Sequence, residues 1–409
     1  MSDNIYLASK PRYEILDGLR GVAALMVIVY HCFETYIPQI GTQVINHGYL
    51  AVDFFFVLSG FVIGYAYDDR WNKMSTWGFF KRRLVRLHPM VVAGTVIGAA
   101  LFFLGDCEEF PLVSKCPAWM FTLCFVMGIF MIPTGPGLDI RGWGETNSFN
   151  GPNWSLTYEY VGNVLYAFIF RRLPKAALAA LCAVSAFFTL DLTLGWDVFG
   201  LFAEAKYDVI GGWSLTADQI YVGFARLLFP FLCGLLISRI LPSHRSENNP
   251  SGSPIHLRGG FWWASLILVT VFSVPQICGK SCLADGIYQS AAIIAIFPFV
   301  VLLGAGSTTS DVLSTKVCKF LGELSYPLYI THFPLIYAQK AWVGSHHDAL
   351  LWQHVAINAG IIVFAVILAW CVYKTYDLPV RKWLTDKVLK KNRAAAVLAG
   401  QRSMQPDKE

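Results

Sequence analysis

The sequence carries few charged residues for its length. Among its 409 residues, Asp, Glu, Lys and Arg make up 14%, and the mean hydropathy is +0.50. An ordinary soluble domain has about 25% charged residues. So low a charge content over the whole chain excludes a disordered protein, a coiled coil and a typical cytosolic enzyme. With 55% hydrophobic residues, the composition is that of a polytopic membrane protein.

The chain also lacks the short motifs of soluble nucleotide-binding and hydrolytic enzymes. It contains no Walker A loop, no GxGxxG, no GxSxG elbow and no HExxH. Cys278 and Cys282 have no nearby His or second Cys pair, so we expect no metal site. The net charge is +5, but no basic array with interleaved aromatic residues occurs. We therefore expect no nucleic-acid partner.

Long apolar runs, in contrast, are numerous. A helix needs about 17–25 apolar residues to cross about 30 Å of hydrocarbon. Ten runs in this sequence reach that length. An eleventh run, Trp119–Ile132, is shorter and lies in a loop rich in Gly and Pro, which favours a re-entrant or interfacial segment. The ten runs that are long enough are Gly18–Ile37, Tyr49–Tyr67, Leu87–Leu104, Trp154–Phe170, Ala176–Leu194, Ile220–Ser238, Phe261–Ile277, Ile287–Gly304, Tyr326–Trp342 and Trp352–Tyr373.

The distribution of Lys and Arg decides which segments cross, because cytoplasmic loops hold the excess of both. If residues 119–132 do not cross, 26 Lys and Arg lie on the side of the termini and 5 on the other side. If they cross, the numbers are 13 and 18. The sequence therefore predicts an all-α protein with ten transmembrane helices plus the short segment near 119–132. We place it in the cell (inner) membrane, within lipid, with both termini in the cytoplasm.

The domain organisation follows from the same pattern. The first 17 residues are polar and lack a secretory h-region, so we expect the first span to act as the insertion signal. We expect residues 1–383 to form one membrane domain and residues 384–409 a basic cytoplasmic tail that begins as a helix. The one linker-like segment is Pro242–Pro254.

Two pairs of cysteines fall in external loops under this topology. Cys107 and Cys116 share one loop, and Cys278 and Cys282 share another. Thiols outside the cell can oxidise, whereas cytoplasmic thiols usually stay reduced. Two disulfides are possible, and the sequence does not fix the geometry of either.

The first span places a cation and an imidazole on one helix face. Arg20 and His31 are eleven residues apart, which amounts to about 16 Å along a helix and about 20° around it. Ionisable groups at this depth are costly and indicate function, and an imidazole is well suited to take a proton. The structural alternative is a histidine that is satisfied by a backbone carbonyl or by Glu34.

A basic cluster, FFKRRLVRLHP, leads into the third span from the cytoplasm. Several of its cations share a helix face through i, i+3 and i, i+4 spacing. Guanidinium groups bind phosphate bidentately, whereas the alternative is an anchor for lipid headgroups. The candidate phosphate-binding residues are Lys81, Arg82, Arg83 and Arg86.

Further polar residues lie inside other spans. Ser155 and Glu159 share a face of the fourth span, where Glu159 could orient an imidazole or a sugar hydroxyl or serve packing. We expect Arg226 to face a carboxylate or a wet cavity, and Asp53 to cap the second span. The ninth span carries a polar stripe of Tyr326, Tyr329 and His332. Its prolines imply a local distortion that neighbouring groups must rescue.

Taken in order, these segments resemble the integral-membrane family usually called acyltransferase 3. They are DGLRGVAALMVIVYH, VDFFFVLSGFVIGY, the Arg83-x-x-Arg86 pair, NWSLTYEY and LSYPLYITHFPL. The resemblance covers about Tyr13 to Leu384 and is specific as a set. A closing segment, YDLPVRKWL, has Asp377 where the family has Glu, so the charge is kept.

The resemblance implies an enzyme with ten membrane helices and a cytoplasmic acyl-CoA co-substrate, most often acetyl-CoA, with no bound cofactor. The family acylates sugars, peptidoglycan and some small secondary metabolites. Its transmembrane His, thought to be the catalytic group, matches His31, and its first-span Arg matches Arg20. Its donor-associated arginine pair matches Arg83 and Arg86.

The sequence thus predicts transfer of an acyl group, acetyl for preference, to a hydroxyl of a cell-surface or exported glycan or a related acceptor. His31 would act as a general base or carry the acyl group itself. Glu159 or Glu34 would hold its tautomer, and Arg20 or Arg226 would steady developing negative charge. The residues expected to line the acceptor cavity are Ser155, Tyr326, Tyr329, His332 and Arg226.

A transporter or flippase of a glycan or small anionic solute is the alternative class of protein. Ionisable residues at the membrane midplane and a polar stripe are equally natural in a carrier. Against a carrier, no inverted repeat is visible, and the basic cluster suits phosphate binding.

Overall fold

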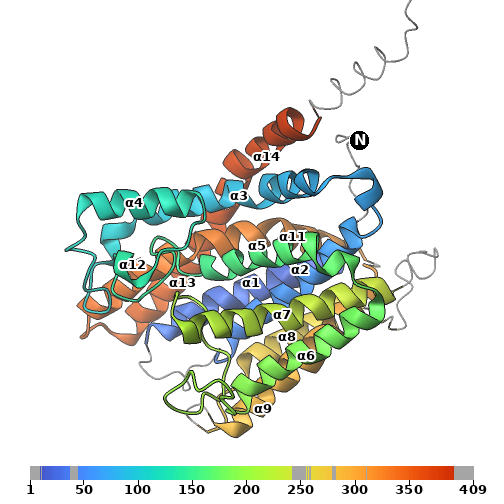
Figure 1. Ribbon diagram of the computed structural model, residues 1–409. Helices are drawn as coiled ribbons and strands as arrows, with labels where there is room; N and C mark the ends of the chain where they lie inside the picture. Colours follow the sequence, from blue (N-terminus) through green and yellow to red (C-terminus); the bar gives the residue numbers. More distant parts are fainter. Residues whose placement is uncertain are drawn as a thin grey trace, which may run out of the picture.

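The protein is a bundle of helices in the computed structural model, which describes residues 10, 12–36, 45–241, 255, 257, 259–278, 282–309 and 311–390. Figure 1 shows α3 and α4 along one flank, α6 and α9 along the opposite flank, and α1, α2, α5, α7 and α11 between them. The helices are α1 (Glu14–Glu34), α2 (Ala51–Tyr67), α3 (Thr76–Ala100), α4 (Ala118–Ile129), α5 (Asn153–Phe168), α6 (Lys175–Thr193), α7 (Ala217–Ile240), α8 (Gly260–Ser273), α9 (Leu283–Ala291), α10 (Phe297–Gly306), α11 (Val312–Thr331), α12 (Phe333–Ser345), α13 (Leu351–Val372) and α14 (Leu378–Leu384).

Six helical stretches are long and apolar enough to cross a membrane: Glu14–Glu34, Gly48–Tyr67, Lys175–Thr193, Ala217–Ile240, Leu283–Gly306 and Leu351–Leu389. Helices α3 and α8 account for part of the difference from the ten predicted spans. In α3 the apolar part follows the basic cluster, and α8 has only 14 residues. The all-helical membrane character of the described chain is therefore clear, and the number of ten crossings stays a prediction.

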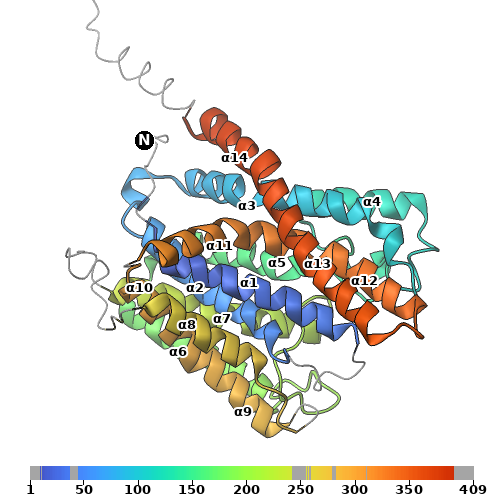
Figure 2. The same ribbon diagram turned by 180° about the vertical axis from the view of Figure 1, so that it is seen from behind.

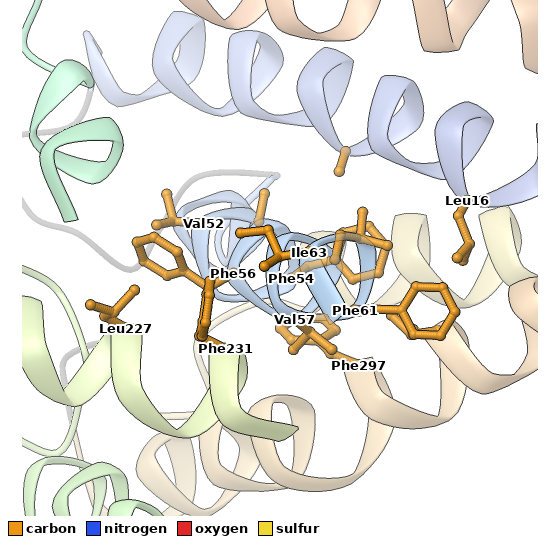
Figure 3. Packing of buried hydrophobic residues seen from close by; sticks show 14 of the residues in the cluster. Leu16, Val52, Phe54, Phe56, Val57, Phe61, Ile63, Leu227, Phe231 and Phe297 are labelled. Atoms are coloured by element: carbon orange, nitrogen blue, oxygen red, sulfur yellow. The ribbon is translucent and has the colours of Figure 1, made fainter. Parts of the chain in front are cut away.

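Helix α2 lies in the apolar core and packs closely on α7. A Cβ atom at Gly60 would lie 1.9 Å from the carbonyl oxygen of Phe231, and one at Gly234 would lie as close to the α2 backbone. Small residues at such positions let membrane helices approach each other. Figure 3 shows the phenylalanines of α2 packed between Phe231 of α7 and Phe297 of α10. This contact fixes α2, which forms one wall of the cavity described below.

The expected ninth span, Tyr326–Trp342, is not one helix. The chain bends at His332, so that α11 ends at Thr331 and α12 begins at Phe333. Pro334 has no N–H to bond the carbonyl four residues earlier, which belongs to Ile330. That carbonyl instead accepts a hydrogen bond from Asn150 Nδ2 at 2.7 Å. The prediction of a distorted backbone rescued by a neighbour is confirmed, and the crossing of the membrane by this segment stays a prediction.

The short apolar segment forms α4, which has 12 residues and packs along α3 (Figures 1 and 2). A helix of this length covers about 18 Å, less than a bilayer core. The chain that follows, residues 130–152, is irregular and yet carries many buried polar side chains. Its polar groups face protein rather than lipid, as irregular backbone at depth requires.

The C-terminal helix is longer than expected. Helix α13 runs on through a π-helical turn, Tyr373–Asp377, into α14 and a further turn that ends at Lys390. In Figures 1 and 2, α14 crosses α3 and projects beyond the bundle. The helical start of the tail is thus confirmed. Residues 391–409 and the linker Pro242–Pro254 lie outside the described residues.

The two cysteine pairs behave differently. Cys278 and Cys282 are joined in a disulfide, with their Cα atoms 6.3 Å apart. Cys107 and Cys116 are free thiols. Of the two possible disulfides, one is therefore formed.

Candidate active site

A cavity of about 500 Å³ opens at the end of the bundle where α3 begins. Its wall follows α2 from Tyr67 to Val52, a length of about 22 Å at the rise of a helix. Helices α1, α3, α5 and α11 and the turns flanking α14 complete the wall. The cavity therefore runs through most of the depth of the bundle.

Cations outnumber carboxylates in the lining of this cavity. The four carboxylates are Asp17, Glu159, Glu323 and Asp377. An excess of positive charge in a cleft with low-dielectric walls attracts an anion and raises its local concentration. The eight cations are Lys10, Arg12, Arg20, Arg70, Arg82, Arg83, Arg86 and Arg381.

Glu159 is held by an arginine rather than by a histidine. Arg83 Nη2 lies 2.6 Å from Glu159 Oε1, and Ser59 Oγ donates to the same oxygen at 3.0 Å. Arg83 is 3% exposed, so the ion pair is almost enclosed. Of the two carboxylates expected to orient His31, Glu159 is thus engaged with the basic cluster.

Arg86 is the cation of the basic cluster that faces the cavity without an ion-pair partner among the described residues. It is exposed to the open interior of the cavity and makes no hydrogen bond or ion pair with the described residues. Arg20 and Arg83 lie near enough for their charges to act on it. The Asp17 carboxylate also acts on it, but no described carboxylate forms an ion pair with Arg86, so its guanidinium can bind an anionic ligand.

The other basic residues have protein partners. Arg20 Nε donates to Ser325 Oγ at 2.9 Å, and its Nη2 lies 3.1 Å from Asp17 Oδ1. Arg82 Nη1 donates to a backbone carbonyl of its own helix. Lys81 lies over the ring of Trp77 and, among the described residues, does not belong to the cavity lining.

His31 forms a pair with the other expected carboxylate. Its Nδ1 lies 2.8 Å from Glu34 Oε2, one turn further along α1. The carboxylate accepts, so Nδ1 carries the proton, and Nε2 of the neutral ring is left as a proton acceptor. The two side chains are 18% and 24% exposed. This is the arrangement of a general base with its orienting acid.

A second imidazole stacks against the first. The ring centroids of His31 and His332 are 5.6 Å apart, with 26° between the ring planes. His332 Nδ1 donates to the carbonyl of Tyr329 at 2.8 Å. Its Nε2 is buried without a hydrogen-bond partner among the described atoms. The bend between α11 and α12 therefore brings a second proton acceptor to His31.

The polar stripe of α11 divides between the cavity and the histidine pair. Tyr326 and Tyr329 line the cavity, together with Ser155. Tyr326 donates to the carbonyl of Leu87 at 2.7 Å, and the hydroxyl groups of Tyr329 and Ser155 are 2.7 Å apart. His332 lies beyond Tyr329, outside the cavity lining that the described residues form.

Arg226 faces a carboxylate, as expected, but it does not belong to the described lining of this cavity. Its Nη2 lies 2.7 Å from Oδ2 of Asp53, and Tyr49 supplies a backbone carbonyl. The predicted cap role of Asp53 is wrong, because its side chain is fully buried in this ion pair. The close contact of α2 with α7 brings the two charges together. Arg226 thus joins α7 to α2 through this ion pair, and its place at an acceptor site stays a prediction.

The irregular segment 130–152 contributes a buried polar cluster that sequence reasoning missed. Glu145 is 4% exposed and accepts a hydrogen bond from Tyr337 at 2.5 Å. Arg141 stacks over the ring of Tyr337. Burial raises the pKa of Glu145 to about 7, although the hydrogen bond and the arginine charge oppose this shift. The signal in the sequence was a Gly- and Pro-rich loop that nevertheless holds an Arg and a Glu.

Sequence reasoning also missed the contribution of the C-terminal helix to the cavity. Tyr373, Asp377 and Arg381 line it, and Arg381 Nη2 lies 3.1 Å from Asp377 Oδ2. Their i, i+4 spacing at the end of the last apolar run could have indicated a shared face. Only the crossing of α14 over α3 shows which wall they form.

The fold and this site define a class: a helical membrane protein whose long cavity concentrates cations and ends close to a histidine–carboxylate pair. The acyltransferase domain family matches residues 13–374. The chain belongs to this family, acyltransferase 3, and is an acyltransferase. The membership that the five sequence segments predict is therefore confirmed.

Individual relatives agree with the family. "Acyltransferase MdmB" of Streptomyces mycarofaciens is 25% identical over 375 residues, which cover 87% of each chain. "Putative O-acetyltransferase SACOL0978" of Staphylococcus aureus (strain COL) is 24% identical over 90% of this chain, which spans 57% of that relative's length. "Protein 2 in picA locus" of Rhizobium radiobacter is 32% identical over 43% of this chain and 91% of its own. No solved structure matches the chain.

Proposed function

We propose that this protein transfers an acyl group, acetyl for preference, from cytoplasmic acyl-CoA to a hydroxyl of a cell-surface or exported glycan or a related acceptor. The observation that carries the proposal is the cation-rich cavity whose inner end lies near the His31–Glu34 pair. A donor with several phosphates matches the first feature, and proton transfer from a hydroxyl matches the second. The names of the relatives support O-acylation.

The donor would bind by its phosphates near the mouth of the cavity. Arg86 offers a guanidinium that has no ion pair with the described residues, and Arg82 and Arg20 lie in the same lining. Arg83 would act through its pair with Glu159, which fixes its guanidinium at the wall. The pantetheine arm would then extend along α2 toward the inner end, so that the thioester arrives at the depth of the histidines.

The chemistry at His31 has two forms. As a general base, Nε2 takes the proton of the acceptor hydroxyl while the oxygen of that hydroxyl forms a bond to the thioester carbon. The C–S bond then breaks, and the proton passes to the sulfur of CoA. As an acyl carrier, Nε2 itself bonds to the carbonyl carbon, the C–S bond breaks and CoA leaves as the thiolate. The acceptor oxygen then bonds to this carbon, the C–N bond to Nε2 breaks, and the hydroxyl proton passes to the thiolate by way of solvent. Glu34 stabilises the positive ring in both forms.

Purified protein with acetyl-CoA and a hydroxyl acceptor tests this function directly. We expect CoA release that depends on the acceptor, and we expect His31→Ala to abolish it while expression in the membrane is kept. Full activity of His31→Ala would refute the role of the histidine. Movement of a glycan or solute without consumption of acyl-CoA would indicate a carrier instead.

The acceptor requires a separate experiment in cells. Mass spectrometry of surface glycans with and without this protein should show acyl groups that depend on it. Complementation with the wild type should restore them, and His31→Ala should not. If the acylation of surface glycans is the same with and without the protein, the acceptor is a hydroxyl compound other than a surface glycan.

A further inference from the structure

The cavity and His31 do not meet in this structure. Among the described residues that line the cavity, neither His31 nor His332 occurs. The lining includes Phe55 and Tyr329, whose ring centroids are 5.5 Å apart in an edge-to-face contact. Tyr329 in turn contacts His332, at 5.8 Å between ring centroids. The rings of Phe55 and Tyr329 therefore form an aromatic layer in the cavity wall, and His332 packs behind Tyr329.

The two rings of this layer are held very differently. The hydroxyl of Tyr329 lies 2.7 Å from Ser155 Oγ and 3.4 Å from the carbonyl oxygen of Pro152, and both partners belong to the start of α5. Phe55 has no polar group and is held by packing alone. It is half-buried, whereas its neighbours Phe54 and Phe56 are buried in the core. Phe55 is therefore the ring that is freer to turn.

The position of Phe55 in the core supports this difference. The apolar core consists of two clusters, one around α2, α7 and α10 and the other around α4, α12 and the outer half of α1. Phe55 packs against the edge of both clusters. Packed cores resist deformation, and a ring at a seam between two of them can move without opening a hole inside either.

We infer that Phe55 is the gate between the donor cavity and His31 and that it limits the length of the acyl chain transferred. The inference rests on the proposed function and deepens it. With Phe55 closed, the thioester stays away from His31. When the ring turns aside, the acyl carbon reaches His31, and the space that the ring vacates sets how long a chain fits beside Tyr329.

A gate of this kind also suppresses hydrolysis of the donor. If water stands in for the acceptor hydroxyl, its oxygen bonds to the thioester carbon and the C–S bond breaks. One water proton passes by way of His31 to the CoA sulfur, and the products are a carboxylic acid, which ionises, and free CoA. Removal of the ring keeps the path open and raises this uncoupled reaction.

The test compares Phe55→Ala and Phe55→Leu with Phe54→Leu in the full-length purified protein. Phe54 lies on the same helix, contacts Phe297 and does not line the cavity. For each variant, CoA release from acetyl-, butyryl- and hexanoyl-CoA is measured with and without acceptor. Phe55→Ala should raise the butyryl-to-acetyl ratio of kcat/KM about tenfold, the discrimination that a few methylene groups provide. Release without acceptor should rise severalfold.

Each outcome bears on either the gate or the function. Phe54→Leu should lower thermal stability and leave the chain-length ratio as in the wild type. An unchanged ratio and unchanged hydrolysis in a folded Phe55 variant would overturn the gate. If Phe55→Ala does not fold, Phe55→Leu decides by the same two measurements. A wild type that transfers no acyl group from any donor would instead refute the proposed function.

Discussion

At the residue scale, the pairing of His31 with Glu34 is the feature on which the chemistry depends. The distance of 2.8 Å assigns the proton to Nδ1 and leaves Nε2 to react. Glu34 is a positioning residue, because it acts through the imidazole. A cation, Lys340, lies near enough for its charge to act on Glu34.

Glu34→Gln should therefore lower kcat by about 10- to 100-fold while KM for acetyl-CoA stays close to that of the wild type. The amide keeps a hydrogen-bond acceptor for Nδ1 but loses the charge that stabilises the protonated ring. Steady-state kinetics over a pH series checks this, with Glu34→Asp as the conservative variant. A kcat unaffected by Glu34→Gln would show that Glu34 serves packing only.

Glu145 gives a prediction about stability and pH. Its pKa is raised to about 7 in the folded protein, whereas it is about 4.3 in an unfolded chain. The unfolded state therefore loses its proton first, and folding stability falls as pH rises from about 4.5 to 7 and is level above that range. At neutral pH the loss amounts to as much as about 3 kcal/mol.

Glu145→Gln should remove this pH dependence, because the amide cannot ionise and still accepts from Tyr337. Melting temperatures in detergent between pH 4.5 and 8 provide the measurement. Asp106→Asn, which changes an exposed carboxylate of a neighbouring loop, is the control. A wild-type melting temperature that rises between pH 4.5 and 7 would contradict the assignment.

At the scale of elements, α3 combines two tasks that its sequence does not separate. Its first turns carry four cations, but they face different surroundings: Arg83 pairs with α5, Arg86 faces the cavity and Lys81 lies on Trp77. A positive-inside anchor would tolerate any of them being lost. A phosphate site depends on Arg86, which faces the cavity and has no ion pair with the described residues.

Arg86→Ala should raise KM for acetyl-CoA by about 10- to 100-fold, the effect of one charge-assisted hydrogen bond, with little change in kcat. Lys81→Ala is the matched control, since it removes one cation of the same cluster, and it should leave KM unaltered. Equal changes of KM in the two variants would show that the basic cluster serves only to orient the protein in the membrane. Raised salt should weaken donor binding in the wild type more than in Arg86→Ala.

Elements also explain which site predictions failed. The i, i+4 spacing of Ser155 and Glu159 correctly placed both on one face of α5, and both line the cavity. Nothing in that spacing could tell that α3 would bring Arg83 to Glu159. The same holds for Asp53, where local sequence favours a cap and the packing of α7 supplies Arg226 instead.

At the scale of the whole molecule, the charge distribution predicts which end of the bundle faces the cytoplasm. The turn between α2 and α3 and the turn between α12 and α13 lie at opposite ends of the bundle (Figure 1). The mouth of the cation-rich cavity lies at the former end. A cytoplasmic donor requires that end to be inside.

Asn72→Cys and Ser345→Cys test this orientation, since both positions are exposed. In intact cells a membrane-impermeant maleimide should label Ser345→Cys above the background of the unsubstituted protein. It should label Asn72→Cys only after the membrane is permeabilised. Labelling of both from one side would exclude the arrangement with ten spans, and the reverse pattern would place the donor cavity outside.

The sequence by itself determined the all-helical membrane class, the family and the principal chemical groups. These depend on local properties: hydropathy over a run of residues, the count of charges in loops and the spacing of side chains on one helix. His31, Arg20 and the basic cluster were identifiable because each lies within a single segment.

Only the tertiary structure decided which of these groups meet. The bend that Pro334 imposes brings His332 to His31, and the passage of α14 over α3 adds Asp377 and Arg381 to the cavity. The aromatic layer of Phe55 and Tyr329 comes from two helices far apart in the chain. Contacts between distant segments depend on how helices pack, and one segment's hydropathy and spacing carry no information about its neighbours' positions.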